Sequence, residues 1–420
     1  MDLEAWEFGL RAAVLSAGAR LLEEMVDGIG SGRRSEPLVC SCGAGMKSKG
    51  LRKKCILTAL GMITIRRSRF ECPDCGNSRY PADEALGVVG TSFSPGVRRL
   101  MARAGSKDTF KEGCDDLKVY ADIAVTAKDV ERVAEDVGRR VDEWERNERK
   151  KLVLNLGEPT RNKDIPLLYV SYDGTGVPMV PWEVAGRKGK QSDGSSKTRE
   201  TKLGCVFTQT ATNDKGRPVR DDNSTTFVGA IENAESFGWQ IYGEAIDRGL
   251  ERAKKVVIIG DGAHWIWNLA DTHFGGAIQI VDLYHARQHL YELVKILAVE
   301  GEKTKYQIKW LTALDEGNVE KIVKEASDLL PRSGKRRKGA KTEINYFKNN
   351  KHRMRYADFR KQDFFVGSGV VEAGCKTIIG KRLKQSGMEW TVRGANSIIA
   401  LRCAYLSNRM EDFWTKQATN

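Results

Sequence analysis

The segment KKVVIIGDGAHW, residues 254–265, contains a short apolar run that ends in an Asp-Gly pair at Asp261. The segment IPLLYVSYDG, residues 165–174, ends in the same way at Asp173. Short apolar runs bounded by turn residues are typical of strands buried in a sheet. Taken alone, each Asp-Gly pair is also common turn chemistry, so two such strand ends predict the sheet more firmly than they predict a site.

Further apolar runs extend the pattern on both sides. KLGCVFTQTATND (202–214) and AIQIVDLYHA (277–286) resemble buried strands. AESFGWQIYGEAIDRGLERA (234–253) is helical in spacing, and residues 286–330 are helical throughout. Strands that alternate with helices predict an α/β arrangement for this half of the chain. The basic stretch PRSGKRRKGAKTE (331–343) predicts a surface loop.

The N-terminal third has a different character. Residues 3–27 carry apolar side chains at helical spacing, and GIGSGRRSEP ends that helix. ILTALGMITIRRSRF (56–70) is rich in β-formers and is interrupted by Gly61, which predicts a hairpin. Residues 94–145 become helical, with Ser94 as the cap of the first helix.

Length and charge bound the class of protein. A chain of 420 residues usually forms two or more units, and 40% hydrophobic residues suffice for a sizeable core. There are 69 Lys and Arg against 56 Asp and Glu, a formal net charge of +13. Such a balance favours an anionic partner, usually nucleic acid, although a merely basic protein fits about equally well until motifs decide.

We expect a cytoplasmic protein. The start, MDLEAWEFGL, lacks the basic and apolar regions of a signal peptide, and no run approaches the roughly 18 apolar residues of a membrane span. In a reducing compartment, the nine Cys are expected as thiols or metal ligands.

Four of these cysteines form two close pairs. Cys40 and Cys42 form a CxC pair, and Cys72 and Cys75 form a CxxC pair within CPDCG. Four soft ligands suit tetrahedral Zn²⁺, and four protein ligands leave no open position for chemistry. We therefore predict a structural zinc site; four unrelated thiols are the alternative. The other cysteines are expected in cores: Cys55, Cys114, Cys205, Cys375 and Cys403.

Several long blocks resemble one family. YDGTGVPMV, GRKGKQSDGSSKTRETKLGCVFTQ, FVGAIENAESFGWQIYGEA, GDGAHWIWNLA, QIVDLYHARQHL and GSGVVEAGCKTIIGKRLKQSGMEWT are similar, in this order, to bacterial insertion-sequence DDE transposases of the ISKra type, which are relatives of the Mutator-like superfamily. The resemblance extends from about residue 36 to Trp414.

The resemblance implies an RNase H-like catalytic core that binds two Mg²⁺ or Mn²⁺ ions. Asp173 matches the first acid of the motif, Asp261 the second and Glu372 the third. Carboxylates are the expected ligands for such ions in two-metal phosphoryl transfer. On spacing alone, an ordinary surface pair between Glu372 and Lys376 is the favoured interpretation.

Three further residues accompany the acids. The DLYH segment places Asp282 and His285 at a spacing known from Mutator-like relatives, where the pair helps to shape the active site. A helix-capping His285 and a strand-ending Asp282 are about equally compatible with the sequence. His264 is interpreted as a packing or supporting residue near the second acid.

Two basic regions are predicted to contact DNA. In similar transposases the N-terminal part recognises the terminal inverted repeats, and the helices at 94–145 resemble a helix-turn-helix region. The second region, 376–409, contains a single acid, Glu389. Phosphate or base contacts are predicted for Arg98, Arg99, Arg103, Lys107, Lys376, Lys381, Arg382, Lys384, Trp390 and Arg393. Packing in the core is equally plausible for Trp390, and a solvated helix face nearly so for each of the four residues from Arg98 to Lys107.

The expected fold is multidomain, α+β and α/β. It comprises an N-terminal helix (1–36), a zinc ribbon (37–84), a helical, helix-turn-helix-like DNA-binding region (85–160), an RNase H-like core in two parts (161–292 and 363–420), and an all-helical insertion domain (293–362) that interrupts the core. The last part of the core carries basic C-terminal helices.

The predicted function is metal-dependent cleavage at insertion-sequence ends and strand transfer into target DNA. The expected partners are double-stranded DNA, as inverted repeats and target, and further copies in a homodimer or higher oligomer on DNA, with no membrane; the bound protein would associate with the nucleoid. Two alternatives remain: a DNA-binding, non-cleaving domesticated transposase that acts as a repressor, and an RNase H-like nuclease without strand transfer.

Overall fold

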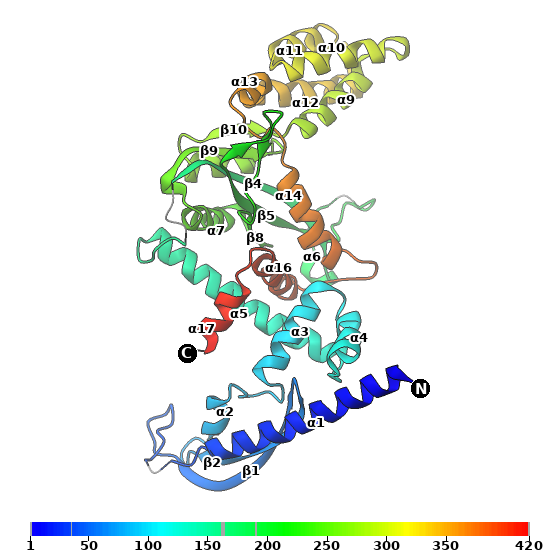
Figure 1. Ribbon diagram of the computed structural model, residues 1–420. Helices are drawn as coiled ribbons and strands as arrows, with labels where there is room; N and C mark the ends of the chain where they lie inside the picture. The colour runs from blue at the N-terminus through cyan, green and yellow to red at the C-terminus, as the bar shows by residue number, and fades with distance from the viewer. Residues whose placement is uncertain (1, 35, 161–163, 190, 419–420) are drawn as a thin grey trace. The chain divides into compact units, whose positions relative to one another are not determined.

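The computed structural model describes residues 2–34, 36–160, 164–189 and 191–418, and the chain divides into two compact units, Met1–Val137 and Gly138–Asn420 (Figure 1). The division falls inside a long helix, α5 (Ala127–Val153). Residues 161–163, where the core was predicted to begin, lie outside the described residues, as does Lys190.

The first unit packs one helix on a hairpin. α1 (Leu3–Ile29) lies on β2 (Gly61–Glu71), which pairs antiparallel with β1 (Lys47–Thr58). Gly61 has a φ of 127°, which a side chain rarely allows, and this explains the glycine at the predicted hairpin turn. A short strand and helix, β3 (Ser78–Arg79) and α2 (Pro81–Ala85), follow.

Two further helices complete this unit. They are α3 (Pro95–Lys107) and α4 (Phe110–Ala121), which pack on each other. The Ser94 hydroxyl accepts a hydrogen bond from the Val97 N–H at 3.2 Å, so the predicted cap is confirmed.

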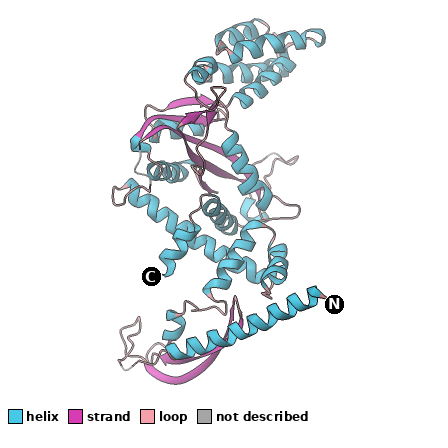
Figure 2. Ribbon diagram, in the orientation of Figure 1, coloured by secondary structure: helices cyan, strands magenta, loops and turns pink. Residues whose placement is uncertain are grey.

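The second unit is a mixed α/β structure built on a five-stranded mixed sheet with the order β10-β9-β4-β5-β8 (Figure 2). The strands are β4 (Ile165–Pro178), β5 (Thr198–Gln209), β8 (Thr226–Ala230), β9 (Ala253–Gly260) and β10 (Ile278–Val281). β4, β5 and β8 pair antiparallel, whereas β9 and β10 run parallel to β4. A separate two-stranded ribbon joins β6 (Ala211–Thr212) and β7 (Pro218–Val219).

Helices cover both faces of the sheet. α7 (Ala234–Asp247) contacts β5, β8 and α8 (His264–His273). The other face holds α14 (Gly369–Gly374) and α16 (Val392–Leu406). Gly374 lies so close to the sheet that a Cβ there would meet the Phe227 ring at 2.7 Å, so glycine lets α14 approach β8.

A helical segment extends from the end of β10. It comprises α9 (Leu283–Leu297), α10 (Lys303–Asp315), α11 (Val319–Asp328), α12 (Gly334–Asn350) and α13 (Tyr356–Lys361). The surface loop predicted for 331–343 is therefore wrong, because α12 begins at Gly334 and buries Ala340, Ile344 and Phe347. Tertiary packing overrides the weak helix preference of its glycine-containing basic start.

The C-terminal segment is anchored by buried charges. Arg409, which precedes α17 (Met410–Ala418), contacts Glu244 at 2.7 Å and Asp247 at 2.6 Å on α7. Arg149 on α5 contacts the same Glu244 at 3.1 Å. Burial opposes ionisation of Glu244, but the charges of Arg409 and Arg149 outweigh it and lower its pKa to about 2.

No helix among the described residues combines the length and the apolar character needed to cross a membrane.

Replacing Arg409 by Met should destabilise the second unit by about 3–5 kcal/mol at neutral pH, because it leaves Glu244 buried with one cation fewer. The difference from wild type should shrink as the pH falls from 4.5 towards 2, where Glu244 gains its proton. Urea unfolding would measure both effects. Lys416→Met is the matched control, since Lys416 pairs with Glu148 at the surface and should matter by less than about 1 kcal/mol. Equal stabilities of the two variants would contradict this account.

Candidate functional site

Three acids lie at the same level on three neighbouring parallel strands, Asp173 within β4 and Asp261 and Asp282 directly after β9 and β10. The strand end predicted at Asp173 is wrong, because β4 continues to Pro178. Ser171 of β4 pairs with Ile259 of β9, so two residues on, Asp173 is level with Asp261. Val281 of β10 pairs with Gly260, so the next residue, Asp282, is level with Asp261 as well. Sheet register alone therefore brings three carboxylates to one edge region of the sheet.

Asp173 is half-buried and lies close to the charge of Asp261. Burial, and then the charge of Asp261, raise the pKa of Asp173, while hydrogen bonds from the Gly174 N–H and the Cys375 thiol oppose the rise. The Gly174 N–H lies 2.7 Å from the Asp173 carboxylate. A half-buried carboxylate beside a second one is a place where a cation is favourable.

Asp261 is held from two sides. Its carboxylate accepts the Ala263 N–H at 2.8 Å, and its backbone carbonyl accepts the Tyr346 hydroxyl of α12 at 3.0 Å. Gly262 has a φ of +101°, and a Cβ there would meet the Tyr346 ring at 2.6 Å. The Asp-Gly pair is thus required by the turn and by the close approach of α12.

Asp282 is fully buried and caps α9. Its carboxylate accepts the His285 N–H at 2.8 Å and also the Ser368 N–H. Both oxygens are therefore engaged by backbone donors, which tie the end of β10 to the segment that precedes α14. Asp282 is therefore the N-cap of α9, and His285 supplies the backbone N–H that this cap binds; His285 is not the capping residue.

Glu372 on α14 lies close to Asp282 and His285. Its carboxylate accepts the Ser368 hydroxyl at 3.3 Å. Ligand atoms of Glu372, Asp282 and His285 all lie within 4.8 Å of one another. The third predicted acid thus lies beside Asp282 and His285, whereas Asp173 and Asp261 lie outside this group of ligand atoms.

The His285 imidazole leaves one polar atom without a hydrogen bond. Its Nδ1 is buried and makes none among the described residues, and the Asp282 carboxylate lies 3.7 Å away. An orphaned imidazole nitrogen beside carboxylates fits a divalent cation or a bound water as partner. His264, by contrast, is exposed at the start of α8 and lies outside this group of ligand atoms.

The helix that carries Glu372 does not continue regularly as predicted. A π-helical turn, η4 (Cys375–Gly380), separates α14 from α15 (Lys381–Leu383). The Cys375 thiol contacts Asp173, which ties this turn to the first acid. π turns inside helices are frequent at functional sites, and no simple sequence pattern announces them.

The basic residues after Glu372 divide into two groups. Lys376, Lys381, Lys384 and Arg393 are exposed, and the Lys384 ammonium donates to the Thr175 hydroxyl at 2.5 Å on the same strand as Asp173. Arg382 and Trp390 are buried, with the guanidinium 5.0 Å from the ring centroid. Buried side chains of this kind do not fit the DNA contacts predicted for these two residues. The burial of Trp390 fits the alternative prediction that it packs in the core.

An exposed aromatic residue that no sequence pattern indicated lies in the segment after β4. Trp182 lies on α6 (Pro181–Val184) directly after β4 and is 70% exposed. α6 is joined to the Trp390 segment by the Val180 N–H, which donates to the Trp390 carbonyl at 3.0 Å. The sequence did not predict this exposure, because a Trp that follows Pro in a short apolar run is usually buried.

In the first unit, α3 presents the other predicted basic residues. Arg99, Arg103 and Lys107 recur every fourth residue and are exposed. Arg98 is half-buried, and its guanidinium donates to the Gly87 carbonyl at 2.5 Å. The helix therefore offers one basic face, with Arg98 turned towards its own chain.

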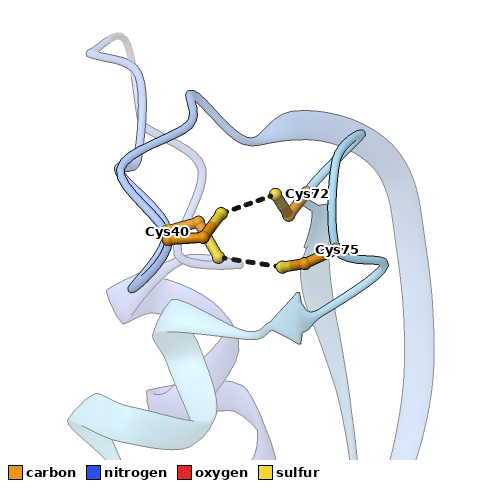
Figure 3. Close-up of side chains that lie close together, drawn as sticks. Cys40, Cys72 and Cys75 are labelled. Carbon is orange, nitrogen blue, oxygen red and sulfur yellow. Dashed lines mark hydrogen bonds between the residues drawn. The ribbon is translucent and has the colours of Figure 1, made fainter.

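The two cysteine pairs come together as predicted (Figure 3). The sulfurs of Cys40 and Cys75 are 3.5 Å apart, as are those of Cys42 and Cys72, and all four lie within 4.8 Å of one another. Tetrahedral zinc with bonds of about 2.3 Å spaces its sulfurs by nearly this much, so the cluster is consistent with a structural zinc site. Hydrogen bonds, chiefly with the Cys42 backbone, lower the pKa of Cys40 to about 6.

The remaining cysteines fit their predicted burial in part. Cys205 and Cys403 are buried, Cys114 and Cys375 are half-buried, and Cys55 is exposed. The core placement expected for Cys55 is wrong, because it lies on the solvent side of β1 beside Thr64.

Comparison with known proteins places the chain in a family. It belongs to the Uncharacterised protein family (UPF0236), whose model matches residues 45–417.

Relatives in this family occur in Caldanaerobacter subterraneus subsp. tengcongensis. A UPF0236 protein named for eleven loci of that organism is 22% identical over 362 residues, which cover 83% of this chain and 67% of the relative. Another, named for two loci, is 23% identical over 366 residues, 83% of this chain and 63% of the relative. The chain thus spans about two-thirds of their length.

Among solved structures, the Drosophila P element transposase strand transfer complex is similar at 9% identity and a TM-score of 0.24, covering 77% of this chain and 80% of that one.

Removing one ligand should abolish zinc binding. Cys72→Ser should lower the bound zinc from about one ion per chain to near zero, because three thiolates do not close the tetrahedron. Elemental analysis of protein purified without chelators would measure it. Cys55→Ser is the matched control, since it removes an exposed thiol from the same unit. A Cys72→Ser protein that keeps its zinc would refute the site.

Proposed function

We propose that this chain is a DDE-type DNA transposase that cleaves DNA at insertion-sequence ends and joins the freed strand to target DNA. The observation that carries the proposal is that β4 and β9 bring Asp173 and Asp261 to the same level, next to the end of β10, where Asp282 lies close to Glu372 on α14. Paired carboxylates held on rigid elements are what two-metal phosphoryl transfer requires.

The five-stranded sheet is, in this proposal, an RNase H-like core. Its first three strands form an antiparallel meander, and the next two add in parallel on the other side of the first strand. That arrangement places the first two acids on adjacent strands. The predicted insertion domain, 293–362, would comprise the end of α9 and the helices α10–α13 that precede α14. The assignment to the ISKra type is part of the same proposal.

Asp173, Asp261 and Glu372 would hold two Mg²⁺ or Mn²⁺ ions. The pKa of Asp173 is raised first by burial and then by the charge of Asp261, and bound cations would favour the ionised carboxylate against both effects. Ions bound there would activate the attacking oxygen and stabilise the leaving oxygen of a phosphodiester.

The neighbouring residues position this group. Asp282, with both oxygens held by backbone N–H groups, fixes the start of α9 against the Ser368 segment that precedes Glu372. His285 directs its unpaired Nδ1 to the cluster and is suited to orient a ligand or a water. His264 is kept as a residue that supports the turn after Asp261 from the solvent side.

DNA would be held by the exposed basic residues. Lys376, Lys381, Lys384 and Arg393 follow Glu372 along the chain, and Lys384 reaches Thr175 beside the first acid. Trp182 offers an exposed ring on which an unpaired base can stack. In the first unit, the basic face of α3 and the cysteine cluster are assigned to recognition of the inverted repeats.

The relatives add support of a different kind. One protein that bears eleven locus designations in a single organism is what a sequence copied within a genome would yield. The proposal extends that property to this chain. Pairing of two element ends further calls for two or more copies on DNA.

Asp261→Asn should abolish strand transfer. With Mg²⁺ and a labelled DNA fragment that carries the element end, the wild-type chain should give nicked and joined products on a denaturing gel. The variant should give at least about 10²-fold fewer, because it loses a carboxylate ligand of the ions. Asp214→Asn, at an exposed turn acid of the same unit, is the control and should keep wild-type yields.

The other outcomes decide between the alternatives. If the protein binds the element end tightly and specifically but gives no product with Mg²⁺ or Mn²⁺, the repressor-like function is favoured over the transposase function. Nicked products that are never joined would replace it by a nuclease.

Lys381→Ala combined with Lys384→Ala should weaken DNA binding and lower the slope of log K against log salt by about one unit per lost phosphate contact. Trp182→Ala should weaken binding of frayed more than of fully paired ends. Fluorescence anisotropy over a salt series would measure both. Lys321→Ala, an exposed lysine of α11, is the control. An unchanged salt slope in the double variant would remove these lysines from the DNA interface.

A further inference from the structure

The helix α1 has an apolar face that packs on its own unit. Ala19 is buried, and Leu22 and Val26 pack with it against Ile56 and Ile63 of the hairpin. The Glu23 carboxylate also accepts the Thr64 N–H at 2.7 Å. This contact accounts for one side of the helix only.

A second apolar face of α1 is exposed. Leu3, Trp6, Leu10, Val14, Leu21 and Met25, here called the α1 stripe, are each between 59% and 67% exposed. At 100° per residue they fall within one sector of about 100° along the whole helix. Within the described part of the first unit nothing covers this sector, and a soluble protein rarely leaves so long an apolar strip in water.

The area of the stripe suits a stable protein interface. Large apolar side chains with this exposure offer on the order of 100 Å² each, so the six approach the roughly 800 Å² per partner of a standard interface. The helix has 27 residues and is therefore about 40 Å long. A partner element must be equally long and narrow to cover it.

The spacing within the stripe points to another helix. Leu10, Val14, Ala17 and Leu21 follow one another at intervals of four, three and four residues, the spacing of a coiled-coil seam. The small Ala17 in the middle lets two helices approach closely.

The charge of α1 disfavours nucleic acid and anionic bilayers as partners. The helix carries five acids, Glu4, Glu7, Glu23, Glu24 and Asp27, against Arg11 and Arg20, in a chain whose net charge is +13. A net negative helix is repelled by nucleic acid and by anionic bilayers. An apolar protein helix remains, and a second copy of α1 presents the same strip in the same form.

We propose that the α1 stripe pairs two copies of this chain, helix against helix. The pairing requires no DNA and does not depend on the proposed function. Its expected effect is a dimer of the free protein at micromolar concentration.

Sedimentation equilibrium of the full chain without DNA tests the pairing. Wild type should show twice the mass of one chain. Leu10→Glu combined with Leu21→Glu should raise the dimer dissociation constant at least about 100-fold, because both charges would be buried in the seam. Met62→Glu combined with Val89→Glu is the matched control, since both residues are exposed apolar side chains of the same unit outside α1. Circular dichroism and zinc content would verify that each variant is folded.

A photo-reactive phenylalanine in place of Val14 supplies a second readout that needs no disruptive change, and its crosslink should join two chains through α1. Four results would overturn the proposal: a wild-type monomer at tens of micromolar, a seam variant that stays dimeric, a crosslink that maps to another element, or a monomer that sediments with anionic phospholipid vesicles through α1.

Discussion

The site depends on one constraint, the in-register parallel pairing of β4, β9 and β10. Because Ser171 faces Ile259 and Gly260 faces Val281, the residues that follow each pair bring Asp173, Asp261 and Asp282 to the same level. A slip of one residue in any of these pairings would turn a carboxylate to the opposite face. The buried apolar cores of the three strands fix the register, so the same residues that form the sheet also place the acids.

Each of the three carboxylates at this level of the sheet is held by hydrogen bonds. Asp282 is satisfied by backbone donors, Asp261 by the turn that Gly262 permits, and Asp173 by Gly174 and Cys375. These contacts hold the carboxylates in place, while burial and, after it, the charge of Asp261 raise the pKa of Asp173. In the proposed function, divalent ions would offset this negative charge and bind a phosphodiester.

The sequence predicted the end of β9 before Asp261 and the cysteine cluster because each depends on local pattern. An apolar run that ends in Asp-Gly, or two close cysteine pairs, needs no knowledge of distant contacts. The sequence did not predict that β4 continues past Asp173, because the pairing with β5 that extends β4 to Pro178 is not encoded in the apolar run. The π turn after Glu372, the helix at 334–350 and the burial of Arg382 and Trp390 depend on packing between segments far apart in the chain, which periodicity does not encode. The exposure of Trp182 and of the α1 stripe was not predicted either, because large apolar side chains are expected to be buried.

The central claim is that Asp173, Asp261 and Glu372 together hold the divalent ions, and anomalous diffraction from crystals of the full chain grown with Mn²⁺ tests it most directly. The account predicts two peaks among these three carboxylates, about 3.5–4 Å apart. Peaks elsewhere, or a single ion held by Asp282, His285 and Glu372 without the other two acids, would contradict it.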